Sequence, residues 1–330
     1  MQFVDVKNIS EILKSKNDII ITTHVNPDGD AIGSSIALAA FLRSIGKNVK
    51  VINISPTPWN LSFLDDDNYI EVFDSQKHKS ELFNTELVCV LDLNDSKRLY
   101  EIGEILEKRE NQTIVVDHHL NPKEFADAYW IDTDAPAVGE MVWEIINEFD
   151  EEYTKTSSDA IYVAIITDTG NFRFDRVDEQ THNIAADLLK HGSKPDELYD
   201  LVYNRVSQGA INLLGDALKG IQTYYNGKLA VMTISDEMFE RNNATEDYIE
   251  GFAGQSLRIN GVEAAITITE VKDRNELRVS FRSKGNVSVR ELAEEFGGGG
   301  HAFAAGARIK DKVLNEARHE LIENASKIFK

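Results

Sequence analysis

The chain has 330 residues and a formal net charge of −21, from 35 lysine and arginine residues against 56 aspartate and glutamate residues. Hydrophobic residues make up 42% and charged residues 28%, which is typical of a globular protein long enough for two domains. Because the sequence has no apolar run near the roughly 18 residues of a membrane span and no signal-peptide core, we expect a cytoplasmic enzyme or binding protein. The single cysteine, Cys89, excludes internal disulfides and cysteine-based zinc sites. So acidic a chain is also a poor candidate for binding long nucleic acid.

The negative charge is unevenly distributed along the chain. Residues 1–219 contain 39 acidic and 20 basic side chains, whereas residues 220–330 contain 17 and 15. Exposed acidic helix faces explain most of this excess. The change in composition nevertheless indicates a domain boundary.

The first part of the chain alternates between strand and helix patterns. Gly46 is the expected C-cap of its first long helix. Strands are predicted at 18–23, 48–54, 87–93 and 113–116, and helices at 30–45, 99–108, 136–149, 157–167 and 179–191. This alternation predicts an α/β fold, with a parallel sheet in the N-terminal domain and helices on both of its faces.

The pattern changes after residue 191. We interpret 1–191 as one domain, 192–219 as a helical connector, and 220–330 as a smaller mixed α/β domain. In the last segment, strands are predicted at 229–235, 262–272 and 276–282, the latter two pairing as a hairpin around 273–275, and helices at 287–296 and 312–328.

Acidic and imidazole side chains cluster where the predicted strands of the first domain end. Because the carboxyl ends of neighbouring parallel strands meet at one edge of a sheet, we expect these side chains to share one crevice. The candidates are His24, Asp28 and Asp30 after the first strand, Asp92 in the third, Asp117, His118 and His119 after the fourth, and Asp168 at the end of a helix.

Several carboxylates and imidazoles without a thiolate favour Mn²⁺ or Mg²⁺ over a structural zinc ion. Carboxylates crowded into one crevice raise one another's pKa values unless cations offset their charge. Two divalent ions would do so, with Asp28 and Asp30 facing different ions and Asp92 bridging them. Such a pair of ions can activate water and polarise a phosphoryl oxygen.

Simpler interpretations of these residues stay open. Asp28 and Asp30 could serve a turn and a helix N-cap, and Asp92 could begin a loop. Asp117 could orient a histidine without touching metal. Adjacent histidines behind a buried strand are harder to explain by packing, and four such clusters in one domain favour a functional site.

A run of four glycines, Gly297–Gly300, is followed by His301. Because consecutive glycines are entropically costly, some neighbour must require a backbone without Cβ atoms. We expect that neighbour to be a phosphate held by amides at the start of a following short helix, with His301 at its head. Arg282, at the end of a predicted strand, offers a guanidinium to the same phosphate. The alternative is a helix C-cap and hinge.

Four motifs together resemble those of the DHH phosphoesterase superfamily, which is named for the triplet found here at 117–119. The other three are THVNPDGDAIGS at 23–34, VLDLND at 90–95 and ITDTGNF at 166–172. Residues 279–306 resemble the DHHA1 domain that accompanies one branch of the family. The two-domain arrangement is similar to that of the stand-alone NrnA-like enzymes, and the resemblance covers nearly the whole chain.

The resemblance implies a fold, an activity and a set of residue roles. His24, Asp28 and Asp92 would hold one Mn²⁺, and Asp30, Asp92, His118 and Asp168 a second, with Mg²⁺ or Co²⁺ as alternative ions. His119, with Asp117, would meet the scissile phosphate and help protonate the leaving oxygen. The implied substrate-binding residues are Arg282, Ser283, Gly298, Gly299, Gly300 and His301.

The implied activity is hydrolysis of very short oligoribonucleotides, of 3′-phosphoadenosine 5′-phosphate (pAp) to AMP, or of both, at a site between two domains that close on the substrate. Cleavage of cyclic or linear dinucleotides such as cyclic di-AMP is the alternative. A pyrophosphatase and a non-catalytic nucleotide sensor fit less well. The resemblance implies no membrane partner and leaves a homodimer possible.

Overall fold

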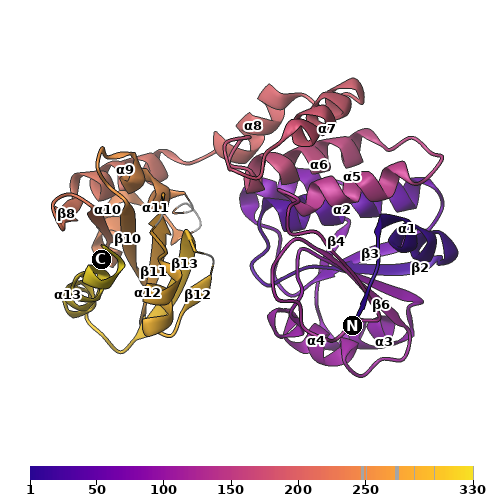
Figure 1. Ribbon diagram of the computed structural model, residues 1–330, viewed down its shortest axis with the longest axis horizontal. Coiled ribbons are helices and arrows are strands. Elements are labelled where there is room, and N and C mark those ends of the chain that lie inside the picture. Colours follow the sequence, from indigo (N-terminus) through magenta and orange to yellow (C-terminus); the bar gives the residue numbers. More distant parts are fainter. Residues whose placement is uncertain (247–248, 250, 272–274, 286, 301, 330) are drawn as a thin grey trace. The chain divides into compact units, whose positions relative to one another are not determined.

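The structure is a computed structural model of residues 1–330, and it describes all of them except 247, 248, 250, 272–274, 286, 301 and 330. The chain forms two compact units, unit 1 (Met1–Arg205) and unit 2 (Val206–Lys330), which are drawn in Figure 1. In the described part of the chain, every helix is too short or too polar to cross a membrane.

Unit 1 is built on a seven-stranded sheet surrounded by helices. Its strands are β1 (Gln2–Phe3), β2 (Asp18–Thr22), β3 (Asn48–Asn53), β4 (Ile70–Val72), β5 (Leu87–Leu91), β6 (Gln112–Asp117) and β7 (Ala128–Ile131). Its helices are α1 (Val6–Ser15), α2 (Gly29–Ser44), α3 (Ser75–Asn84), α4 (Glu101–Leu106), α5 (Val138–Asn147), α6 (Lys155–Asp168), α7 (Glu179–Lys190) and α8 (Pro195–Tyr203), with 3₁₀ turns η1 (Trp59–Asp65) and η2 (Ser96–Leu99).

The sheet of unit 1 has the strand order β1-β7-β6-β5-β2-β3-β4, and its paired strands are all parallel. Side chains alternate between two buried faces: Ile19 and Ile21 pack with α2, α5 and α6, whereas Ile20 packs with α3 and α4. The prediction of a parallel sheet with helices on both faces is therefore confirmed. The strand order reverses between β2 and β5, which is where sheets of this kind form a crevice.

Helices α2 and α6 pack closely because glycines line their contact. A Cβ atom on Gly29 would lie 2.3 Å from Thr167 Oγ1, and one on Gly33 would lie 2.5 Å from the Ala160 carbonyl oxygen. The contact between Gly29 and Thr167 places the first turn of α2 beside the last turn of α6. The glycines of the DGDAIGS segment thus bring the acidic ends of these two helices together.

Unit 2 contains a six-stranded mixed sheet. Its strands are β8 (Gln222–Tyr224), β9 (Leu229–Ile234), β10 (Ala264–Val271), β11 (Glu276–Ser283), β12 (Gly299–Gly300) and β13 (Ala304–Lys310). Its helices are α9 (Gln208–Lys219), α10 (Asp236–Asn242), α11 (Phe252–Gln255), α12 (Arg290–Glu295) and α13 (Leu314–Asn324), with 3₁₀ turns η4 (Ser256–Arg258) and η6 (Ala325–Phe329).

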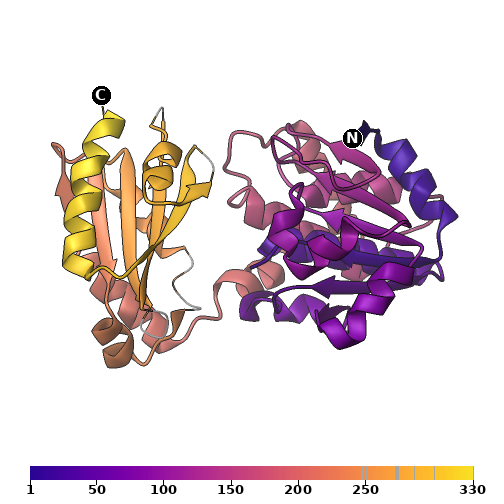
Figure 2. The same cartoon turned by 90° about the horizontal axis from the view of Figure 1, so that it is seen from below.

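The sheet of unit 2 runs in the order β12-β13-β11-β10-β9-β8, and only β9 and β10 are parallel among its described pairs. One face packs against α12 and α13 through residues such as Val279 and Phe281; Figure 2 shows α13, in yellow, along this face. The β9 end of the other face is covered by α9, α10 and α11. The predicted pairing of β10 with β11 is confirmed, and residues 273 and 274 of its predicted turn lie outside the described residues.

The predicted connector is divided between the two units. Leu198 and Val202 of α8 belong to the core of unit 1, whereas Leu213 and Ala217 of α9 belong to a core cluster of unit 2. The predicted domain limits of 191 and 220 stay predictions. The sequence analysis did not identify the short strands β1, β4 and β7, which have two to four residues and too little alternation to be recognised.

The predicted short helix after the glycine run is wrong, because the hairpin of β12 and β13 occupies that segment. Gly297, with a φ of 71°, ends α12 as a C-cap, since its N–H donates to Glu294 and that of Gly298 donates to Ala293. A Cβ atom on Gly298 would lie 2.1 Å from the Gly306 carbonyl oxygen. A neighbouring strand, and not a phosphate, is thus what requires this glycine. His301 lies outside the described residues.

The packing of α2 on α6 can be tested by adding one methyl group. Gly33→Ala should reduce the free energy of unfolding by about 1–3 kcal/mol, because the new Cβ overpacks the helix contact. Gly215→Ala in α9 is the matched control: its Cβ meets open space, so it should stabilise by up to about 1 kcal/mol. Urea denaturation measures both, and equal effects of the two substitutions would contradict the packing argument.

Candidate metal centre

The candidate centre lies at the carboxyl edge of the sheet in unit 1, where β2, β5 and β6 end side by side. His24 follows β2, Asp92 follows β5, and Asp117 is the last residue of β6. Asp92 has a left-handed backbone, with a φ of 56°, while its N–H still donates to the Val116 carbonyl. This turn directly after the strand places the Asp92 carboxylate among groups from all three strands.

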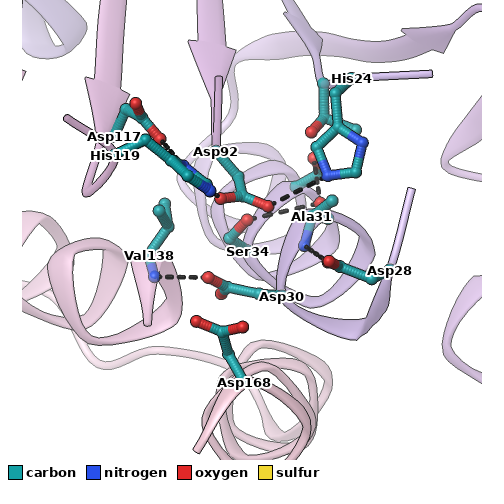
Figure 3. Close-up of polar contacts among 12 residues, drawn as sticks. His24, Asp28, Asp30, Ala31, Ser34, Asp92, Asp117, His119, Val138 and Asp168 are labelled. Carbon is teal, nitrogen blue, oxygen red and sulfur yellow. Dashed lines mark hydrogen bonds and ion pairs between the residues drawn. The ribbon is translucent and has the colours of Figure 1, made fainter. Parts of the chain in front are cut away.

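The carboxylate of Asp92 is buried at the middle of the cluster (Figure 3). Its Oδ2 lies 3.3 Å from His24 Nε2, and its Oδ1 lies 3.7 Å from His118 Nε2 and 3.6 Å from His119 Nδ1. Among the described residues, Oδ1 accepts no hydrogen bond. A buried carboxylate oxygen without a donor is costly, and a cation is one partner that would offset that cost.

Two of the histidine rings are held so that Nε2 points toward the carboxylates. The Nδ1 of His24 donates to the Val25 carbonyl and the Nδ1 of His118 donates to that of Ala135, both at 2.9 Å. Burial lowers the pKa of His24, and burial together with the neighbouring His119 lowers that of His118 to about 4. At neutral pH both rings are uncharged, so Nε2 carries the lone pair that a metal ligand needs.

Three further carboxylates, those of Asp28, Asp30 and Asp168, lie near Asp92. Asp28 is the N-cap of α2, since one of its oxygens accepts the Ala31 N–H at 3.1 Å. Asp30 is almost fully buried and accepts the N–H groups of Val138 and Gly139 at 2.7 and 2.9 Å. These donors form the first turn of α5, where the helix dipole favours a negative charge. The N-cap interpretation of Asp28 is thus confirmed, and it leaves the second carboxylate oxygen for another partner.

Crowding and burial make these carboxylates reluctant to ionise. Burial, then the charges of Asp92, Asp168 and Asp28, raises the pKa of Asp30 well above its ordinary value. Burial, with Asp28 as the next cause, raises the pKa of Asp168 to about 7 and that of Asp92 well above the ordinary range. Figure 3 shows the side chains of Asp30, Asp92 and Asp168 facing a common space. The electrostatics are those of a site that gains from binding positive charge.

The donor atoms fall into sets that suit divalent cations. His24, Asp28 and Asp92 form one set, and Asp30, His118 and Asp168 form another, each with ligand atoms within 4.8 Å of one another. Both contain carboxylate oxygens and one neutral imidazole nitrogen, which is a donor set suited to Mn²⁺. All six residues that the sequence predicts as ligands therefore lie together.

His119 is held differently from the other two histidines. Its Nδ1 lies 2.7 Å from Oδ1 of Asp117, whose side chain is fully buried. Burial lowers the pKa of His119, but the hydrogen bond that the ring donates to Asp117 and the charge of Asp92 outweigh burial and raise the pKa overall. His119 also joins Asp92 and His118 in a third donor set. Because its Nδ1 donates to a carboxylate, the geometry favours a proton donor oriented by Asp117.

Part of the predicted substrate-binding set of unit 2 lines a shallow depression of about 490 Å³, whereas Gly300 is not in its lining. Its lining includes Arg282, Gly298 and Gly299, whereas Ser283 is buried and donates its hydroxyl to the Val287 carbonyl at 2.6 Å. Within this run, an added Cβ atom would meet open space at Gly297 and at Gly299. The guanidinium of Arg282 donates to the Phe281 carbonyl at 3.0 Å.

Sequence analysis missed several groups that shape the centre. Backbone groups of Ala135, Val138 and Gly139 orient His118 and Asp30, and no side-chain pattern signals them. Arg98 and Arg176 are exposed side chains whose positive charge lowers the pKa of nearby groups, His24 and Asp168 respectively among them. A basic residue close behind each acidic motif was the available signal for these two arginines.

Comparisons with known proteins agree with this geometry. Residues 18–188 match the model of the DHH family N-terminal domain, and residues 226–329 match that of the DHHA1 domain. The chain is 30% identical to the "bifunctional oligoribonuclease and PAP phosphatase NrnA" of Thermus thermophilus, over 96% of this chain and 91% of that protein. It is equally similar, at 30%, to the Bacillus subtilis protein of the same name, over 88% and 89%.

A solved structure is also similar over nearly its full length. It is an exopolyphosphatase-related protein from Bacteroides fragilis, with a TM-score of 0.93 and 28% identity, covering 98% of this chain and 95% of that one. The match extends across both units, so the combination of the two folds is shared.

Metal binding should relieve the repulsion at Asp92. At pH 8, Mn²⁺ at 100 times its dissociation constant should stabilise the EDTA-treated protein by about 2.7 kcal/mol per site. Asp92→Asn should lose most of this gain, while without metal it should be at least as stable as the parent. Asparagine tolerates the left-handed backbone at this position, so the substitution removes mainly the charge.

Differential scanning fluorimetry with and without Mn²⁺ measures both effects. Glu110→Gln, an exposed acidic residue on the same unit, is the matched control and should respond to Mn²⁺ like the parent. If Asp92→Asn gains as much from Mn²⁺ as the parent does, Asp92 is not a ligand.

The pairing of Asp117 with His119 predicts a pH dependence. Since this pairing raises the pKa, the ring keeps its proton above pH 6.5 and releases it as the pH rises through the elevated value. Asp117→Asn should lower the titration midpoint of His119, measured by NMR on metal-free protein, because it removes the carboxylate that raises the pKa of the ring. Asp150→Asn, an exposed substitution, should leave the midpoint unchanged. An unchanged midpoint in Asp117→Asn would exclude the proposed orientation.

Proposed function

We propose, because this chain belongs to the DHH family and also contains a DHHA1 domain, that it is a metal-dependent phosphoesterase acting on short oligoribonucleotides and on pAp. Two divalent cations, Mn²⁺ in preference to Mg²⁺ or Co²⁺, would be its cofactors. The observation on which the proposal chiefly rests is the buried Asp92 carboxylate, which has one oxygen without a hydrogen bond and lies between three histidines.

In this proposal each residue at the sheet edge has a distinct task. His24, Asp28 and Asp92 would hold one cation, and Asp30, His118 and Asp168 the other, with Asp92 shared. When bound, such a pair lowers the pKa of water and polarises phosphoryl oxygens. Val138 and Gly139 keep Asp30 in place through their N–H groups, so its position does not depend on the cation.

His119 would supply the proton that hydrolysis requires. A water oxygen forms the new bond to phosphorus and gives up a proton to solvent, while the bond to the ester oxygen breaks and the leaving oxygen takes a proton from His119, which regains one from solvent. Despite burial, the hydrogen bond to Asp117 raises the pKa of His119 above its ordinary value, which favours the protonated ring that a general acid needs. Asp117 acts as the positioning residue, because it fixes the ring through Nδ1 and stabilises the imidazolium.

The substrate class follows from the two NrnA relatives, whose names describe an oligoribonuclease and PAP phosphatase. The charge distribution supports a short substrate. Residues 1–219 carry nearly twice as many acidic as basic side chains, which disfavours a long polyanion, whereas residues 220–330 are nearly neutral and offer Arg282. We therefore propose substrates of one to a few nucleotides.

A parallel assay tests this function. The purified chain with Mn²⁺ should convert pAp to AMP and phosphate, and should shorten pApA and a five-nucleotide RNA; cyclic di-AMP and pyrophosphate complete the substrate set. His119→Gln should lower kcat by about 10²-fold or more, with little change in metal content. Glu110→Gln serves again as the control. If no substrate turns over while two Mn²⁺ ions remain bound, the proposal is wrong.

A further inference from the structure

The outer face of strands β11 and β13 carries a row of arginines. Residues of β11 alternate, so that Leu277, Val279 and Phe281 point into the core, whereas Arg278, Ser280 and Arg282 lie on the opposite face. On β13, Arg308 is the direct partner of Arg278, Gly306 of Ser280, and Ala304 of Arg282. Two guanidinium side chains thus stand directly opposite each other, with a third at the far end of the row.

This arrangement is unfavourable for the protein alone. Like charges directly opposite each other in an antiparallel pair destabilise a sheet. Among the described residues, Glu276 is the one carboxylate that forms an ion pair with either of these two arginines, and its partner is Arg308. No ion pair of Arg278 is found among the described residues, and its side chain is exposed. The face therefore retains more positive than negative charge.

On this face, the part over β11 and β13 is hollow, whereas the β9 end is covered by α9, α10 and α11. The depression of about 490 Å³ is lined by all three arginines, and its floor contains small residues, among them Gly299, Ala304 and Gly306. A Cβ atom on Gly299 would meet open space. A ligand can thus reach the backbone between the arginines, which suits a compact anionic group.

We propose that Arg278 and Arg308 form a second anion subsite, which holds a phosphate of the substrate other than the one near Arg282. The proposal rests on the proposed function, and it specifies that the substrate carries more than one phosphate. A guanidinium binds a phosphate through two parallel hydrogen bonds, and two opposed guanidiniums suit one doubly charged group. Arg278 and Arg282 are four residues apart, about 13 Å along the strand, so a ligand touching both is extended. Oligonucleotides and linear polyphosphates share this chemistry.

The test measures binding without turnover. Affinities of the EDTA-treated protein for a fluorescent five-nucleotide RNA and for tripolyphosphate are determined between 50 and 300 mM salt, approximately the range in which phosphate contacts dominate. R278Q/R308Q should weaken RNA binding about tenfold and reduce the slope of log Kd against log salt by about 0.7 for each lost phosphate contact. R290Q/K312Q removes two exposed charges elsewhere on unit 2 and should change neither quantity.

The outcomes separate the possible ligands. If R278Q/R308Q binds both RNA and tripolyphosphate more weakly than the parent, the subsite recognises phosphates alone. If it binds RNA more weakly but tripolyphosphate equally well, the subsite is specific for nucleotides. Equal affinities of R278Q/R308Q and R290Q/K312Q, or no RNA binding by the parent, overturn the subsite. R278Q alone breaks no ion pair among the described residues, so it should keep the parent's melting temperature while still weakening RNA binding, which separates the loss of a phosphate contact from misfolding. Because no catalysis is needed, a parent that binds RNA but hydrolyses nothing would refute the proposed function and leave the subsite standing.

Discussion

Repulsion between buried carboxylates is the constraint on which the arrangement of unit 1 depends. Asp30, Asp92 and Asp168 come from different parts of the chain; after burial, the charges of Asp92 and Asp168 raise the pKa of Asp30, and the charge of Asp168 also contributes to the raised pKa of Asp92. A fold that merely needed stability would place apolar side chains at this edge. Holding the carboxylates together requires the glycine contact of α2 with α6 and the N–H groups of α5 around Asp30. Packing and hydrogen bonds thus maintain a charge arrangement that bound cations would make favourable.

Adjacent histidines acquire opposite properties from their partners at this edge. His118 donates Nδ1 to a neutral carbonyl, and burial and the neighbouring His119 lower its pKa to about 4. His119 donates Nδ1 to the carboxylate of Asp117, which raises its pKa despite burial. One ring is thereby suited to offer a lone pair and the next to offer a proton. Because Asp117 ends β6, three consecutive residues contain both a ligand candidate and an oriented acid.

Much of this centre could be predicted from sequence, because its side chains follow strands whose order places them at one edge. The juxtaposition of His24, Asp92 and His118 requires only that β2, β5 and β6 be neighbours. The partners of Asp30 could not be predicted, since they are backbone groups of a distant helix. The glycine run was misinterpreted for a related reason: a pattern shows that a Cβ atom is excluded at Gly298, but not which neighbour excludes it.

The two units concentrate charge of opposite sign. Unit 1 gathers negative charge at a sheet edge, which bound cations would offset, whereas the β11–β13 face of unit 2 gathers positive charge in a hollow, which a bound anion would offset. Phosphate esters are chemically suited to either kind of site, since their oxygens bind divalent cations as well as guanidinium groups. The opposed pair Arg278 and Arg308 would bind a second phosphate, in addition to one near Arg282. In this proposal, the number of phosphates in a ligand, more than its bases, determines how well it binds to this face.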